Sequence, residues 1–224
     1  CGHNGAMLLK VLFIIPHDFI PPNSGNKNLF YALLSGVSPH VECDLVILAE
    51  SVGPEVKSRI QSEFPHVKEI YIFPKPSGFQ LQLSRLKFVL AGYHHALGRY
   101  RNAALEKWIE NRADDYDLIH FDMVHVAPYR VFCGSVPTLL VASDAYSMAA
   151  KSARHAGRMG VIETGYQLIQ EWCLRRFERK NYPQFGLVCT VSDVDTAWLK
   201  TVASKTDIRT IGIGLAAEYT ENPI

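Results

Sequence analysis

Residues 8–15 (LLKVLFII), 21–28 (PPNSGNKN) and 29–34 (LFYALL) read in order as a buried strand, a polar loop and the start of a helix. In α/β proteins such a unit presents backbone N–H groups at a helix N-terminus, where anions bind. Gly25 lets the chain approach a ligand closely and adopt dihedral angles that other residues resist. One glycine in such a loop is common, and its place in the first βα unit is what makes it informative. The stretch predicts an α/β fold with a ligand site after the first strand.

The composition is that of an ordinary folded protein. A chain of 224 residues forms one large domain or two small ones, and it is 48% hydrophobic and 20% charged. The net charge of +1 gives no global reason to expect a nucleic-acid partner. The five cysteines are odd in number and show no CxxC spacing, so we interpret them as reduced side chains rather than a disulfide framework.

Short apolar runs alternate with helical patterns along the chain. The strands are predicted at 9–15, 43–48, 69–73, 118–121, 138–142, 187–191 and 208–211. The helices are predicted at 28–37, 54–63, 80–97, 102–114, 145–181 and 193–202, the long one with a break near 157–160, where two glycines lie. Because the strands are continuously apolar, a buried parallel sheet is expected. The pattern predicts an α/β fold with a Rossmann-like open parallel sheet and helices on both faces.

Three segments are expected. Residues 1–6 share nothing with the first strand and are interpreted as the remnant of an expression tag, with Met7 as the native start. Residues 7–212 form the Rossmann-like domain, and residues 213–224 begin an interdomain linker. No apolar segment reaches the roughly 18–20 residues that a membrane span needs.

Five ordered motifs support a more specific interpretation. They are the loop with Gly25, residues 117–122 (DLIHFD), residues 136–147 (VPTLLVASDAYS) with Arg154 downstream, residues 176–178 (RFE) with 185–195 (FGLVCTVSDVD), and residues 211–219 (IGIGLAAEY). Together they resemble the N-terminal domain of a GT-B glycosyltransferase of the retaining family 4 type. The sequence departs from that pattern at Ser24-Gly25-Asn26, at Ser143 and at Gly212-Ile213-Gly214, where the family usually has Gly-Gly, His and Pro-Asn-Gly.

The resemblance implies half of a GT-B enzyme. In such enzymes a second α/β domain holds most of the nucleotide-sugar, so this chain would be the acceptor-binding half and inactive in transfer by itself. The implied activity is hexosyl transfer from a nucleotide-sugar donor to a glycan or lipid-linked acceptor, in cell-envelope polysaccharide or glycoconjugate synthesis. The implied location is the cytoplasm, at the inner face of the membrane. No cofactor and no metal are expected.

Two carboxylates are the candidate catalytic residues. Asp122 and Asp144 end two predicted strands and therefore lie on the ligand side of the sheet, where a carboxylate can orient an acceptor hydroxyl. Either could instead cap the helix that begins after it. His120 lies within its strand and is expected in the core, whereas His125 is one helical turn past Asp122 and faces the same side.

The other candidate residues are predicted to contact either the nucleotide-sugar donor or the sugar acceptor. Backbone donors at Gly25 and Asn26, with Ser24 beside them, would stabilise the charge on a leaving diphosphate. Ser192 lies at the interdomain cleft in the resemblance, although a capping role is the obvious alternative. On the acceptor side the candidates are His125, Ser147, Arg154 and Arg158. The pattern around Glu178 favours a solvated charged helix face.

Charge distribution adds one further prediction. Residues 70–105 contain no acidic side chain but several cations, together with an apolar row, and a second acid-free window covers residues 145–162. The plain interpretation is a helix packed on the sheet with solvated charges. The alternative is a basic amphipathic surface that contacts a membrane or a phosphorylated, lipid-linked acceptor.

Two other functions are alternatives to the transferase. One is a stand-alone Rossmann-like module that binds a nucleotide or other ligand without catalysis, in which case any nucleotide binding would depend on Gly25. The other, a dinucleotide oxidoreductase, is disfavoured because the sequence has no GxGxxG motif.

Overall fold

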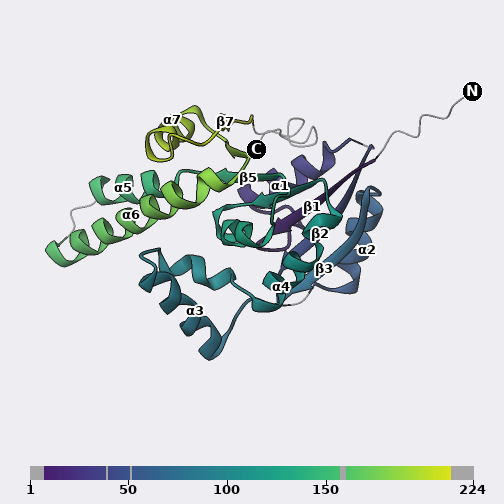
Figure 1. The fold of residues 1–224 in the computed structure, drawn as a ribbon, viewed down its shortest axis with the longest axis horizontal. Coiled ribbons are helices and arrows are strands. Elements are labelled where there is room, and N and C mark those ends of the chain that lie inside the picture. Colours follow the sequence, from purple (N-terminus) through teal and green to yellow (C-terminus); the bar gives the residue numbers. More distant parts are fainter. Residues whose placement is uncertain (1–7, 39, 51, 157–159, 213–224) are drawn as a thin grey trace, which may run out of the picture.

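A computed structural model describes residues 8–38, 40–50, 52–156 and 160–212 (Figure 1). The interpretations of residues 1–6 and 213–224 as a tag remnant and a linker lie outside the described residues, as does Arg158.

The core of the fold is one parallel sheet. Its strands are β1 (Leu9–Ile15), β2 (Val41–Leu48), β3 (Val67–Phe73), β4 (Leu118–Asp122), β5 (Thr138–Ser143), β6 (Leu187–Thr190) and β7 (Ile208–Thr210). They form a seven-stranded sheet in the order β3-β2-β1-β4-β5-β6-β7, and every neighbouring pair is parallel. The predicted fold class and all seven predicted strands are confirmed, and no strand end differs from the prediction by more than two residues.

Helices connect the strands. They are α1 (Gly25–Ser35), α2 (Pro54–Glu63), α3 (Gly78–Leu90), α4 (Ala103–Arg112), α5 (Tyr146–Ala156), α6 (Val161–Asn181) and α7 (Asp193–Val202). Short 3₁₀ segments are η1 (His95–Tyr100), η2 (Ala113–Asp115), η3 (Val124–Phe132) and η4 (Tyr182–Gln184). The predicted break in the long helix is confirmed, because α5 and α6 are separate helices that run side by side as a projecting hairpin (Figure 1).

Alternate residues of the central strands build two cores. Leu12 and Ile14 of β1 face α4, η3 and the C-terminal part of α6. Phe13 and Ile15 face the opposite way, toward α1 and α2. This alternation is the period-two geometry of a strand, and it explains why strands buried on both faces are apolar at nearly every position.

The structure corrects the single helix predicted over residues 80–97. The helix α3 ends at Leu90. Gly92 then adopts φ +72°, a left-handed backbone conformation that is unfavourable for residues with a Cβ atom. The chain returns as η1, and Gly98 packs so tightly on α3 that a Cβ there would lie 2.9 Å from the Arg85 backbone nitrogen. Both glycines are therefore required by tertiary packing.

Candidate functional site

The sheet has a switch point between β1 and β4. The chain leaves β1 toward the face covered by α1, whereas it leaves β4 through η3 on the opposite face. In open parallel sheets such a divergence opens a crevice at the carboxyl ends of the strands, and ligands bind there. The loops after β1, β4 and β5 lie at this edge of the sheet, and we call the position between them, where this rule expects a ligand, the crevice.

The N-terminus of α1 lies open on one side of this crevice. Ser24 is the N-cap residue by its extended backbone, but its side chain makes no capping hydrogen bond. Among the described residues, no partner is recorded for the N–H groups of Gly25 and Asn26. A Cβ at Gly25 would meet nothing within 4 Å. Free, exposed N–H groups at a helix N-terminus are the kind of donor that binds anions, which is the role predicted for Ser24, Gly25 and Asn26.

Asp122 lies on the other side, as the last residue of β4. Its side chain is buried and its Oδ2 has no hydrogen-bond partner among the described residues. Burial raises the pKa of Asp122 to about 7. A buried carboxyl group with an unused oxygen at the carboxyl end of a central strand is poised to exchange a proton near neutral pH.

The backbone is strained immediately beyond Asp122. Met123 adopts φ 70°, and Ser143 at the end of the neighbouring strand β5 adopts φ 62°. Neither residue is glycine, and such conformations persist only where surrounding contacts enforce them, most often at functional sites. The Ser143 hydroxyl is buried and has no partner among the described residues. Two adjacent strand ends therefore carry unused buried polar atoms.

His125 lies in an aromatic setting. Its ring centroid is 4.6 Å from that of Tyr100 and 5.6 Å from that of Tyr146. Burial, together with the nearby charges of His17, Arg99 and Lys75, lowers the pKa of His125 to about 4. The imidazole is therefore neutral at pH 7, with its Nδ1 buried and unpartnered within the described part of the chain. It can donate or accept one hydrogen bond to a ligand.

Five side chains at this site were missed by sequence reasoning: His17, Lys75, Arg99, Tyr100 and Tyr146. The Lys75 Nζ lies 5.0 Å from the centroid of the Tyr100 ring. His17 and Lys75 each stand two residues past a strand end, so the rule that selected Asp122 could also have found them. Tyr100 comes from η1, and no local signal marks it.

Asp144 is exposed next to these residues. No hydrogen bond of its carboxylate is recorded among the described residues, so the alternative capping role is not observed. Partial burial raises the pKa of Asp144, and the neighbouring Asp195 raises it further. Its carboxylate is therefore free to contact a ligand.

Ser192 caps α7 and helps to tie two loops together. The Asp195 N–H donates to Ser192 Oγ at 3.1 Å, which confirms the predicted capping alternative. The Ser192 hydroxyl in turn donates to the Asp195 carboxylate, whose Oδ1 accepts the Ala145 N–H at 2.8 Å. Asp195, held in place by Ser192, thus joins the first turn of α7 to the loop after β5.

Loss of this cap is expected to destabilise the domain. Ser192→Ala removes the acceptor of the Asp195 N–H and one hydrogen-bond donor to the Asp195 carboxylate, so the free energy of unfolding should fall by about 1 kcal/mol. Urea denaturation measures the change. Ser58→Ala, on the exposed face of α2, is the matched control and should cost nothing. Equal effects of the two substitutions would contradict the capping role.

The structure places two other predicted residues, Ser147 and Arg154, away from a ligand contact. Ser147 is fully buried, donates from its N–H and its hydroxyl to Glu178, and accepts the Trp198 Nε1–H at 2.9 Å. Arg154 is paired with Glu171 at 3.2 Å in the last turn of α5. Arg158 lies outside the described residues.

Glu178 corrects the prediction of a solvated helix face. It is almost completely buried, and burial raises its pKa to about 7, against the opposing effect of the Ser147 hydrogen bonds. Its partner Ser147 belongs to α5, and the Ser147 hydroxyl in turn accepts the Nε1–H of Trp198 from α7, so α5 and α7 fold over α6. The carboxyl group therefore holds three helices together, a structural role that sequence spacing did not reveal.

His120 is in the core, as predicted. Burial lowers its pKa to about 3, and its ring centroid lies 4.8 Å from that of Phe13. Within the described ranges, no three His, Cys, Asp or Glu side chains are grouped so that they could hold a metal ion. Every helix in the same ranges is too short or too polar to cross a lipid bilayer.

No protein-family model and no curated protein sequence matches this chain. Solved structures do. A UDP-glucosyltransferase from Polygonum tinctorium matches with a TM-score of 0.52 at 10% identity, over 96% of this chain and 54% of its own. Medicago truncatula UGT71G1, complexed with UDP-glucose, matches with a TM-score of 0.52 at 12% identity, over 92% and 52%. Anabaena Alr3699/HepE, in complex with UDP and glucose, matches with a TM-score of 0.50 at 15% identity, over 92% and 44%.

The fold is that of one half of a GT-B glycosyltransferase. This chain spans about half the length of these structures. At sequence identities of 10–15%, the similarity establishes a shared fold.

Proposed function

We propose that this chain is the acceptor-binding half of a retaining, family 4-like glycosyltransferase. The enzyme would transfer a hexosyl group from a nucleotide-sugar to a glycan or lipid-linked acceptor, in cell-envelope polysaccharide or glycoconjugate synthesis on the cytoplasmic side of the membrane. One observation carries the proposal: α1, with its open N-terminus, is the helix that follows β1, and the buried carboxyl group of Asp122 ends β4, the strand next to β1 at the switch point.

The α1 N-terminus would stabilise the leaving group. Transfer breaks a sugar–diphosphate bond, so negative charge develops on the diphosphate. Free N–H groups at Gly25 and Asn26 stabilise such charge without a metal. Lys27, which is paired with Asp18 at 3.2 Å, adds a cation in the same turn.

Asp122 and His125 would act on the acceptor. Asp122, with its pKa near neutrality, would orient the acceptor hydroxyl or take its proton. Neutral His125 would donate or accept one hydrogen bond from a sugar, while Tyr100 and Tyr146 offer ring faces against which a sugar packs. Asp144, exposed at the end of the neighbouring strand, would bind further hydroxyl groups.

The test uses the full-length protein that contains this chain. Release of nucleoside diphosphate is measured over a set of nucleotide-sugars, with and without glycan and lipid-linked acceptors. We expect acceptor-dependent turnover of one donor and no transfer by residues 1–224 alone. Failure to bind or consume any nucleotide-sugar would overturn the proposal. Binding of nucleotide by the isolated chain, dependent on Gly25 and without transfer by the full-length protein, would favour the stand-alone module.

A charge placed at Gly25 should separate donor binding from folding. Gly25→Glu fits the open space around this position, and an acidic residue in the first helical turn is favourable, so the fold should persist. The same carboxylate repels a diphosphate, and we expect the donor KM of the full-length enzyme to rise at least about tenfold. Gly160→Glu, at the equally open N-terminus of α6, is the control and should leave the donor KM unchanged. Equal KM values for both variants would remove α1 from the donor site.

A further inference from the structure

The outer face of α3 is apolar. Phe79, Leu83, Leu86 and Leu90 have the spacing i, i+4, i+7, i+11, so they form one row along the helix. All four are exposed, Phe79 by 81% and Leu90 by 78%. The buried residues of α3, Ser84 and Phe88, lie on the other side and pack against the domain. A helix that is apolar on both sides needs a second covering.

A second apolar row lies on α6. Ile162, Tyr166, Ile169 and Trp172 are exposed, Ile162 by 91%, and their spacing places them along one side of the helix. The residues of α6 that are buried against the domain, such as Leu174 and Glu178, lie on a different side. The two helices thus present eight exposed apolar side chains, which we call the α3–α6 surface.

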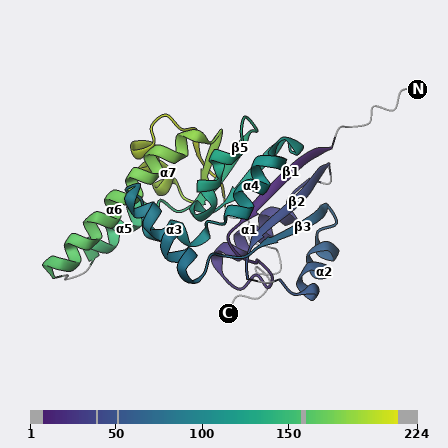
Figure 2. The ribbon, with the colours of Figure 1, turned by 60° about the horizontal axis from the view of Figure 1, so that its bottom comes forward.

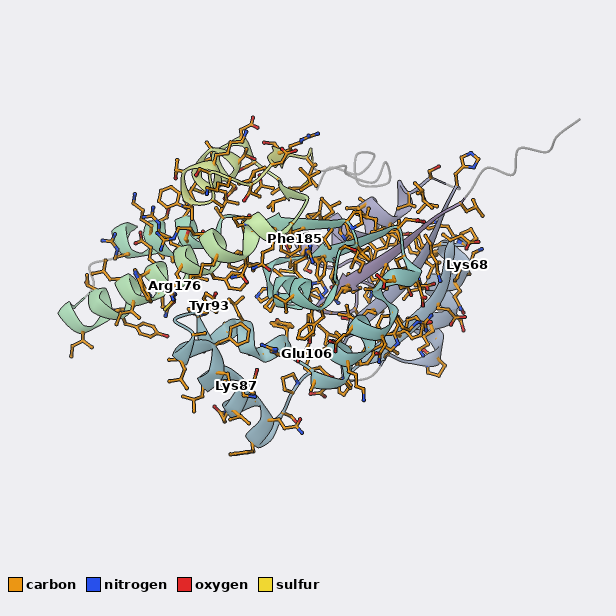
Figure 3. The ribbon with its side chains drawn as sticks, in the orientation of Figure 1. Lys68, Lys87, Tyr93, Glu106, Arg176 and Phe185 are labelled. Atoms are coloured by element: carbon orange, nitrogen blue, oxygen red, sulfur yellow. The ribbon has the colours of Figure 1, made fainter. Side chains whose placement is uncertain are left out.

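The two rows adjoin. A Cβ at Gly92, just past α3, would lie 2.9 Å from Arg176 Nε and 3.5 Å from Trp172 Cη2 of α6. The ring centroids of Tyr93 and Phe177 are 5.3 Å apart. Figures 1 and 2 show α3 beside α6, and Figure 3 shows Tyr93 next to Arg176 at this junction. The α3–α6 surface is therefore one continuous region of the molecule.

Cations surround the α3–α6 surface. Arg175, Arg176 and Arg179 line a cavity of about 270 Å³ beside Trp172. Within the described part of the chain, Arg176 and Arg179 have no ion-pair partner, and Arg176 Nε has no hydrogen-bond acceptor. On α3, Lys87 is exposed, and the chain from 70 to 105 has no acidic residue to balance it. Apolar rows bordered by unpaired arginines complement an anionic surface with an apolar interior.

We propose that the α3–α6 surface docks on a bilayer that contains anionic lipids. The apolar rows enter the boundary between headgroups and acyl chains, and the arginines beside Trp172 bind lipid phosphates. A second copy of the chain fits less well, because self-association would place these unpaired cations against one another. The docking proposal rests on the proposed function, because it places sugar transfer at a membrane. Vesicle binding is measured in the absence of a sugar donor or acceptor. Its failure is therefore distinct from failure of the transferase proposal.

The test is cosedimentation of the 224-residue chain with vesicles. We expect binding to vesicles that contain phosphatidylglycerol, little binding to pure phosphatidylcholine, and loss of binding as salt rises. The double substitution Phe79→Ser and Leu90→Ser should weaken binding at least about tenfold. Arg176→Gln with Arg179→Gln should weaken binding by about 25-fold, since each arginine near the surface contributes about fivefold.

Two substitutions on other surfaces serve as controls. Val194→Ser removes an exposed apolar side chain from α7, and Lys68→Gln removes a cation from the opposite end of the molecule (Figure 3). Both should leave vesicle binding unchanged, and thermal unfolding confirms that each variant is folded. Absence of binding to anionic vesicles, or equal loss in test and control variants, would overturn the proposal. So would a concentration-dependent dimer that Phe79→Ser with Leu90→Ser abolishes, because the surface would then be an interface between copies.

Discussion

Replacing Asp122 by asparagine is expected to lower the rate of sugar transfer by the full-length protein by about 10²- to 10⁴-fold, as loss of a general acid–base group does. Asparagine has nearly the same shape as aspartate but cannot take a proton. The rate of acceptor-dependent nucleoside diphosphate release measures the effect. Asp114→Asn, an exposed aspartate on η2, is the matched control and should retain the full rate. A variant at position 122 with undiminished turnover would exclude Asp122 from the reaction.

The Asp122→Asn substitution should also change how the free energy of unfolding depends on pH. The pKa of Asp122 is about 7 in the folded chain against an ordinary value of 3.8, so the protonated form is favoured in the folded state. Its contribution to stability is therefore complete below pH 3.8 and is lost as pH rises toward 7. Between pH 5 and pH 7, the free energy of unfolding of wild type minus that of Asp122→Asn should fall by about 2 kcal/mol.

Comparison of the two proteins isolates this effect. The lowered pKa values of His120 and His125 act in the opposite direction, since their contribution is present above pH 6.5 and is lost on acidification. Both histidines titrate in wild type and variant alike, so they largely cancel in the difference. Urea denaturation at several pH values provides the measurement. A difference that does not change with pH would mean that Asp122 is not a buried carboxyl group.

The second large effect is expected at Glu178. Glu178→Ala should lower the free energy of unfolding by about 3 kcal/mol, because the buried N–H and hydroxyl of Ser147 both lose their acceptor. The Trp198 indole donates to the same Ser147 hydroxyl, which Glu178 would no longer hold in place. Glu178→Gln keeps one acceptor oxygen and the side-chain volume, so it should cost only about 1 kcal/mol. Equal losses in the two variants, measured by urea denaturation, would show that the hydrogen bonds contribute little.

The strands were predictable because their signal is local. The apolar runs at β1, β4 and β5 mark strands buried on both faces, whatever the rest of the chain does. The helix predicted over 80–97 was wrong because its end depends on distant contacts. Gly92 turns the chain beside Arg176, and Gly98 packs on the α3 backbone. Neither neighbour can be inferred from periodicity.

The candidate site likewise contains residues that the sequence could identify and residues that it could not. Gly25 and Asp122 were identifiable because each lies at the end of a predicted strand or in the loop after it, and parallel strands end at one edge of the sheet. Tyr100 was not, because η1 reaches the site only after α3 has folded back. Ser147 and Glu178 were misjudged for a related reason. Their burial exists only where α5 and α7 close over α6.

The sequence by itself determined the parallel α/β sheet, the break between α5 and α6, and the carboxylate and glycine at the strand ends. Each depends on a run of residues and on backbone preferences that act over a few positions. Only the tertiary structure decided which polar residues are buried, how His125 is enclosed by Tyr100 and Tyr146, and that the rows on α3 and α6 adjoin. Burial and electrostatic coupling depend on contacts between segments far apart in the chain, and no local pattern encodes those distances.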